Sequence, residues 1–168
     1  MRSSSRRRLL GLALAVTCAL AIVSSRSDAR ARGQAQPAEV KIFLVALDDK
    51  GKAGKKVGCD DSLVAVSRTL EAGVGPLEGA IRALLAAPEE TPGTPALGNY
   101  WKGTDLKLAS VVLRGGTATI RITGEISVAG VCDEPRITGQ IEETARQFPT
   151  VKRVRVYVNG RALAQVIR

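Results

Sequence analysis

Histidine, the most common general base and zinc ligand near neutral pH, is absent from the 168 residues of this sequence. Also absent are the Gly-x-Ser-x-Gly motif of many hydrolases and a glycine-rich loop ending in Gly-Lys, which holds phosphates. The neighbouring carboxylates Glu142 and Glu143 point in different directions if they lie on a helix, although Glu125 or Asp105 paired with another group across a cleft stays open. We therefore expect a protein that is not an enzyme and that binds no cofactor.

Aromatic side chains are scarce and make up only 3% of the residues. Two basic clusters, at residues 50–56 and 152–155, lack the interleaved aromatics on which nucleic-acid bases stack. We expect these clusters to be a solvated loop and a solvent-facing strand, with no nucleic-acid partner. The alternative is that they bind peptidoglycan or another anionic cell-wall polymer, or a nucleic acid. The basic residues concerned are Lys50, Lys52, Lys55, Lys56, Lys152, Arg153 and Arg155.

Two of the few aromatic residues, Tyr100 and Trp101, are adjacent in a loop rich in proline and glycine. Aromatic residues in loops are often contact sites. We therefore treat Tyr100 and Trp101 as candidate contact residues, together with Arg153 and Arg155 of the basic strand. The competing interpretation is that Trp101 holds the loop onto the core.

Metal ligands in a recognisable spacing are also lacking. The aspartate pairs at residues 48–49 and 60–61 do not have the alternating oxygen ligands and closing glutamate of a calcium loop, and aspartate is ordinary in turns. Without histidine, the cysteines supply too few ligands for zinc. We predict no metal site.

The longest run of apolar and small residues, 9–23, has 15 residues, whereas a membrane-spanning helix needs about 20 apolar residues. It follows a cluster of arginines, and small residues follow it near Ala29 and Ala31. This order is typical of a secretory signal peptide. We predict a signal peptide over residues 1–31, cleaved after Ala29 or Ala31.

Three other interpretations of the same segment stay open. The apolar run could remain as an uncleaved membrane anchor. Residues 5–10, Ser-Arg-Arg-Arg-Leu-Leu, resemble a twin-arginine export signal. Cys18 could carry a lipid, although the three residues before it fit a lipoprotein box poorly. We expect membrane association only through an anchor or a lipid, and otherwise an exported protein that is periplasmic, extracellular or associated with the cell wall.

The positive charge of the whole chain, +9, belongs mostly to this first segment. Residues 1–31 hold six arginines and one aspartate, so residues 32–168 carry 25 − 6 = 19 basic and 16 − 1 = 15 acidic side chains, a net charge of +4. About 130 residues suit one domain with one core. We expect a flexible leader over residues 32–38 and a single folded domain over residues 39–168.

A β-hairpin is the most clearly specified structure, at residues 106–123. The Gly115-Gly116 pair suits a two-residue hairpin turn, and alternation on both sides gives one apolar and one polar face. A slip of one residue would exchange the faces, so the register is strongly specified. The predicted pairs are Arg114 with Thr117, Leu113 with Ala118, Val111 with Ile120, and Ala109 with Ile122.

The remaining elements have recognisable limits. Residues 40–47 are almost continuously apolar and predict a central strand, and residues 63–70 predict a second strand. One helix begins at Pro76 and stops at Pro88, and another begins near Asp133 and stops at Pro149. Residues 151–158 predict the last strand. The predicted class is α+β, with a single layer of helices on a mixed or antiparallel sheet in the order β-β-α-β-β-α-β.

Three segments together resemble a known family, the sporulation and spore germination domain, GerMN. They are LVAVSRTLEAGVGPLEGAIRALLAAP (residues 63–88), GTDLKLASVVLRGGTATIRI (103–122) and QIEETARQFPTVKRVRVYVNGR (140–161). The resemblance implies a non-enzymatic, extracytoplasmic and often lipid-anchored domain, similar to ring-building modules of envelope assemblies. It implies envelope proteins as partners and supplies no catalytic residue. We thus expect a protein-interaction or envelope-assembly module.

Cys59 and Cys132 are the cysteines that remain after the predicted cleavage. An even number of cysteines in an exported domain favours a disulfide. Both precede predicted elements, Cys59 a strand and Cys132 a helix, and so could meet at one end of a sheet. We predict a structural disulfide between Cys59 and Cys132, while free thiols and pairing between molecules stay open.

Overall fold

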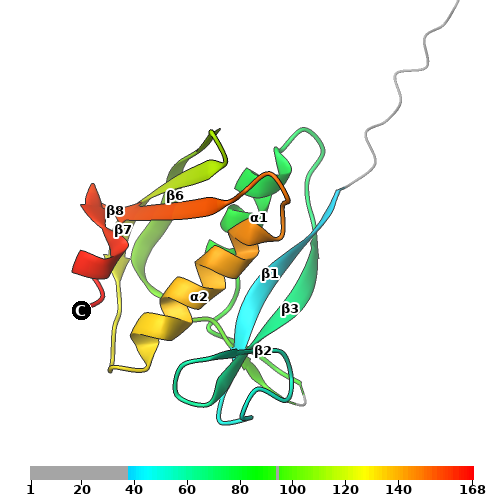
Figure 1. Ribbon diagram of the computed structural model, residues 1–168, viewed down its shortest axis with the longest axis vertical. Helices are drawn as coiled ribbons and strands as arrows, with labels where there is room; N and C mark the ends of the chain where they lie inside the picture. Colours follow the sequence, from blue (N-terminus) through cyan, green and yellow to red (C-terminus); the bar gives the residue numbers. More distant parts are fainter. Residues whose placement is uncertain (1–37, 94) are drawn as a thin grey trace, which may run out of the picture. The chain divides into compact units, whose positions relative to one another are not determined.

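The computed structural model describes residues 38–93 and 95–168 (Figure 1). The predicted signal peptide, the twin-arginine and Cys18 alternatives and nearly all of the leader lie outside the described residues. Within the described part, no helix is both long and apolar enough to cross a membrane.

The first sheet is built around β1 (Glu39–Ala46), which lies in the middle of five strands in the order β2-β3-β1-β5-β4. Its long partner is the antiparallel strand β3 (Asp61–Thr69). The other strands are short: β2 (Lys55–Val57), β4 (Glu90–Thr91) and β5 (Leu97–Gly98). Ile42, Leu44 and Val45 of β1 are fully buried. The prediction of a central strand here is confirmed.

The second sheet has four strands in the order β6-β7-β8-β9. They are β6 (Gly103–Arg114), β7 (Thr117–Ile126), β8 (Arg153–Val158) and β9 (Arg161–Ala162). The predicted hairpin joins β6 and β7, and both turn glycines have the positive φ that this turn requires, 53° at Gly115 and 72° at Gly116. β8 lies parallel to β7, and α2 connects them.

The hairpin register agrees with three predicted pairs and departs from the fourth. Arg114, Leu113 and Val111 pair with Thr117, Ala118 and Ile120, as predicted. The predicted pair of Ala109 with Ile122 is wrong, because a register irregularity between Leu108 and Ser110 places Leu108 opposite Ile122. A bulge of this kind takes up one residue and changes the face of those beyond it. The larger Leu108 therefore reaches the core, while Ala109 is exposed.

Two helices complete the fold. α1 (Pro76–Leu85) begins with proline at its first position, and α2 (Asp133–Arg146) begins just after Cys132. Each helix turns an apolar stripe toward the core. Ala80, Ile81 and Leu84 of α1 and Ile137, Ile141 and Ala145 of α2 are fully inaccessible.

The helices contact both sheets, α1 through β1 and β6, and α2 through β1 and β8. One hydrophobic cluster contains residues from both helices and both sheets. The α+β class and the order of the long elements are confirmed, but the prediction of a single sheet is wrong. Alternation in a strand shows which face is buried and does not show which strand it pairs with, so the division into two sheets was not readable from the pattern.

Leu84 offers a direct test of this shared core. Leu84→Asp is expected to unfold the domain, because it places an unpaired carboxylate at a fully inaccessible position. Circular dichroism should show no cooperative melting transition. Ala72→Asp, at an exposed position between β3 and α1, is the matched control and should melt like the parent. A Leu84→Asp protein with the parent's melting curve would contradict this packing.

Candidate functional site

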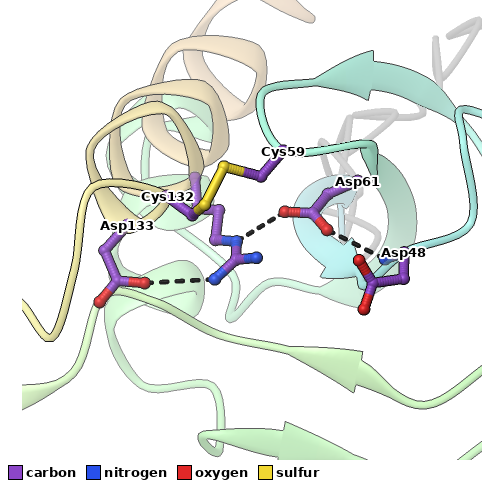
Figure 2. The surroundings of a disulfide bond; sticks show 6 residues. Asp48, Cys59, Asp61, Cys132 and Asp133 are labelled. Atoms are coloured by element: carbon purple, nitrogen blue, oxygen red, sulfur yellow. Dashed lines mark hydrogen bonds and ion pairs between the residues drawn. A yellow bond between two sulfur atoms is a disulfide. The ribbon is translucent and has the colours of Figure 1, made fainter.

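The disulfide ties two distant segments together (Figure 2). Cys59, in the turn between β2 and β3, is bonded to Cys132 at the start of α2, with a Cα–Cα distance of 5.8 Å and a sequence separation of 73. These are the two cysteines that the sequence analysis paired. The bond fixes the beginning of α2 against the edge of the first sheet.

A buried ion-pair cluster lies beside the disulfide. Asp61 is fully inaccessible, and its Oδ2 accepts a hydrogen bond from Nε of Arg136 at 2.6 Å. Nη1 of Arg136 donates to Asp133 at 3.3 Å, and the backbone N–H of Asp48 donates to Asp61 at 3.0 Å. Figure 2 shows Asp61 and Asp133 on opposite sides of the guanidinium. Asp61 and Asp133 thus share one cation, the guanidinium of Arg136.

The ring of Tyr100 lies against this cluster. The guanidinium of Arg136 is 4.8 Å from its centroid, and Nζ of Lys102 is 5.5 Å away. Partial burial raises the pKa of the Tyr100 hydroxyl. Burial lowers the pKa of Arg136, but its hydrogen bond and charge interaction with Asp61 outweigh this effect and raise the pKa overall. Both side chains therefore keep their usual protonation states in neutral solution.

Trp101 is not a surface contact. It is only 2% exposed, and its indole Nε1 donates to the carbonyl oxygen of Ile137 at 2.9 Å. The contact interpretation of Trp101 is therefore wrong. The competing interpretation is correct, because Trp101 holds its loop onto the core. A buried residue with a satisfied N–H has no polar group left for a partner.

Gln140 is a structural residue that sequence reasoning missed. It is fully inaccessible, and its amide bridges three segments by accepting from the N–H of Tyr100 at 2.8 Å and donating to the carbonyl of Phe43 at 2.9 Å. The available signal was its spacing, three residues after Ile137 and within the buried stripe of α2. A polar residue at such a position needs partners inside the protein.

The loop after β1 depends on a second aspartate. Asp49 accepts hydrogen bonds from the hydroxyl of Ser62 at 2.5 Å and from the N–H groups of Gly51 at 3.1 Å and Ala53 at 2.6 Å. The hydrogen bond from Ser62 is the main cause of a lowered pKa for Asp49. Among the described residues there is no group of three potential ligands that could hold a metal ion. Asp49 therefore acts as a hydrogen-bond acceptor that holds this loop.

The lowered pKa of Asp49 predicts a pH dependence of stability. Since the folded-state pKa lies below the unfolded value, the unfolded chain binds more protons between the two values. The stabilisation is complete above the ordinary aspartate pKa of about 3.9 and is lost as the pH falls through the folded-state value. The melting temperature of Asp49→Asn should therefore fall less on acidification from pH 5 to pH 3 than that of the parent. Glu71→Gln, at an exposed position, is the control, and equal acid sensitivity of parent and Asp49→Asn would contradict this role.

Arg153 and Arg155 lie on one face of the second sheet, the face that points away from the helices. We call it the outer face. The opposite face carries the buried residues Ala118, Ile120 and Ile122, which alternate along β7 with the residues of the outer face. Arg114 of β6 and Arg121 of β7 also lie on the outer face, and all four arginines are exposed. The outer face is formed by Ser110, Val112, Arg114, Thr117, Thr119, Arg121, Arg153, Arg155 and Tyr157.

The outer edge of β8 is largely unpaired. β9 pairs only with Tyr157 and Val158, so among the described strands none pairs with residues 153–156 on the side away from β7. A groove of about 360 Å³ runs beside this edge. Its lining includes Thr138 and Glu142 of α2, Val154 and Val156 of β8, and Ala164 beyond β9. An open strand edge beside a groove is a ready-made place for an extended segment.

Comparison with known proteins identifies the family. The description "Germane: Sporulation and spore germination" matches residues 43–164, well over half of the chain. The chain belongs to this family. The resemblance to GerMN domains noted in the sequence is thereby confirmed.

Solved GerMN domains share this fold. The first GerMN domain of the sporulation protein GerM from Bacillus subtilis is 18% identical with a TM-score of 0.55, over 77% of this chain and 88% of that one. The tandem GerMN domains of the same protein are 18% identical with a TM-score of 0.53, over 74% of this chain. The chain spans only 40% of that tandem structure. No curated protein matches the chain.

Proposed function

We propose that this GerMN-type protein is an exported, non-enzymatic domain that takes part in envelope assembly by binding a segment of another envelope protein. Three features support export: the signal-peptide pattern of residues 1–31, the disulfide between Cys59 and Cys132, and membership of a family described by sporulation and spore germination. Export places the domain where envelope proteins are its neighbours.

The observation that carries the proposal is the open edge of β8 beside its groove. A partner segment in extended conformation can add to the edge as a further strand, with main-chain hydrogen bonds supplying affinity and the groove supplying specificity. Val154 and Val156 give the groove apolar side chains, and Thr138 and Glu142 of α2 give it polar ones. The groove therefore suits a segment that alternates apolar and polar residues.

The charge of the edge sets a further condition on the partner. Arg153 and Arg155 are exposed along this edge, and like charges on an edge strand oppose uncontrolled pairing between copies of the same chain. A partner strand with acidic residues facing these arginines would be favoured, whereas a basic one would be repelled. The edge therefore favours acidic partner strands over basic ones.

Site-specific crosslinking in the native envelope tests the proposal. A photoreactive residue at Ala164, which lines the groove, should give one defined protein adduct. The same residue at the exposed loop position Ala53 is the control and should not give that adduct. Thr138→Trp, which fills the groove, should abolish the adduct formed from Ala164. The same adduct from both positions, or recovery of generic polymer alone, would contradict the proposal.

Export itself gives a separate prediction. The mature protein isolated from outside the cytoplasm should begin at Arg30 or Arg32, because cleavage follows Ala29 or Ala31. N-terminal sequencing of the isolated protein measures this directly. If the isolated protein instead began with a lipid-modified Cys18, it would be a lipid-anchored protein and this prediction would be wrong. If it began with Met1 and was found in purified membranes, the apolar run would be an uncleaved anchor.

A further inference from the structure

The cations of the outer face gather on one side of the second sheet and have no acidic partners among the described residues. In the described chain, ion pairs involve Lys55, Lys56, Arg82, Arg136, Arg146 and Arg168, and none includes a cation of the outer face. The sequence gives the reason, because residues 106–124 and 144–168 contain no aspartate or glutamate. The uncompensated positive charge of the domain is thus concentrated on one side of the second sheet.

The strand register orders these cations into rows across the sheet. Arg114, Thr117 and Arg153 form the row next to the turn, followed by Val112, Thr119 and Arg155, and then by Ser110, Arg121 and Tyr157. Lys107 and Thr123 follow beyond the bulge. Each of these four rows therefore carries at least one cation, whereas the next pair in the register, Thr104 with Glu125, carries an acidic residue. Since alternate residues on a strand lie about 7 Å apart and neighbouring strands about 4.8 Å apart, successive cations are about 7–8 Å apart along an oblique stripe.

The other side chains of the face identify the kind of partner. Hydroxyl groups of Ser110, Thr117 and Thr119 lie between the arginines and can hydrogen-bond to uncharged polar groups. The aromatic ring on the face, Tyr157, is covered by Arg121, whose guanidinium lies 5.0 Å from the ring centroid. A covered ring does not serve as a stacking platform for nucleic-acid bases. The face thus favours a ligand of regularly spaced anions and hydroxyl groups, without bases.

We propose that the outer face binds a linear polymer of polyol units joined by phosphodiesters. Arginine presents a planar fork of donors that matches phosphate oxygens, and four of the five cations in the rows are arginines. A flexible polyanion can meet one cation after another along the stripe and release counterions at each contact. This site lies on the strand faces, whereas the segment-binding groove lies at the edge of β8. The two sites share Arg153 and Arg155, so the cations of β6 and β7 are the ones that test the outer face alone.

Binding of poly(glycerol phosphate) to the exported protein, with its disulfide intact, tests the proposal. Arg114→Gln combined with Arg121→Gln removes two cations from β6 and β7 without touching the β8 edge. This variant should bind at least tenfold more weakly than the parent. The slope of log affinity against log salt concentration should also become shallower by about 1.4, which is the counterion release of two phosphate contacts to a single-stranded polyanion.

Three controls make the result decisive. Lys50→Gln with Lys52→Gln removes the same net charge from the exposed loop after β1 and should change the affinity by less than twofold. Thr138→Trp, which fills the groove, should leave polymer binding unchanged. Both charge variants should melt like the parent, because the substituted side chains are exposed.

Specific outcomes would overturn the proposal. An equal loss of polymer affinity in the two charge variants would show that the polymer responds to the net charge of the protein. It would exclude a specific site on the outer face. Tighter binding of a polygalacturonate of equal charge number would exclude phosphate as the recognised group. Tighter binding of an oligothymidylate of equal charge number would indicate base stacking and a nucleic-acid partner.

Discussion

Arg136→Met is expected to lower the free energy of unfolding by about 3–5 kcal/mol, the usual cost of leaving a buried ion without its partner. Asp61 is fully inaccessible and Asp133 is 4% exposed, and Arg136 is the cation paired with both. Methionine keeps much of the apolar stem of arginine, so the loss should come chiefly from the unpaired carboxylates. Urea denaturation followed by circular dichroism measures the change.

Two comparison variants separate the buried charge from other effects. Arg146→Met removes a cation of the same helix that pairs with Glu142 at the surface, 2.9 Å away, and should cost at most about 1 kcal/mol. Arg136→Met combined with Asp61→Asn should recover part of the stability, because the introduced amide carries no charge and its oxygen could still accept the N–H of Asp48. The proposed role of the charges would be wrong if Arg136→Met lost no more stability than Arg146→Met and if adding Asp61→Asn restored none of it.

Local patterns in this chain predicted local structure well. Gly115-Gly116 located the turn, because two consecutive positive φ angles are costly for other residues, and alternation then set the pairs nearest to it. Pro76 marked the first turn of α1 for an equally local reason. Each of these signals acts between residues that are close in sequence.

The unpredicted features depend on contacts between distant segments. The bulge at Ala109 depends on whether Leu108 or Ala109 better fills the space over the helices, which the hairpin alone does not reveal. Likewise, the burial of Trp101 depends on a carbonyl in α2, 36 residues away. A loop composition rich in proline and glycine is compatible with either an exposed or a buried tryptophan.

The outer face was also predictable only in part, because one part of it depends on neighbouring residues and the other on pairing between distant strands. The polar face of the hairpin, including Arg121, was readable from alternation. Its union with Arg153 and Arg155 depends on the parallel pairing of β7 with β8, which brings together residues 117–122 and 153–158 across the α2 crossover. The sequence thus contained both halves of the basic surface and lacked the pairing that joins them.

Removal of the disulfide by Cys59→Ala and Cys132→Ala is expected to destabilise the domain by about 4 kcal/mol. The two cysteines are 73 residues apart, and in the chain-entropy model a bond closing a loop of this length removes that much freedom from the unfolded chain. This is a large part of the roughly 5–15 kcal/mol that stabilises a typical domain. In a domain of this size the melting temperature should fall by roughly 10–20 °C.

The denatured state distinguishes this mechanism from a simple loss of packing. Without the bond, the unfolded chain expands and exposes more surface, so the dependence of the unfolding free energy on urea should become steeper. Val131→Ala, next to Cys132 and 91% exposed, is a control that should alter neither stability nor slope. Before any comparison, mass spectrometry of unreduced peptides from the exported protein should contain the Cys59–Cys132 pair. Two alkylatable thiols in that protein would exclude the bond, and an unchanged slope with lower stability would point to lost contacts at the start of α2.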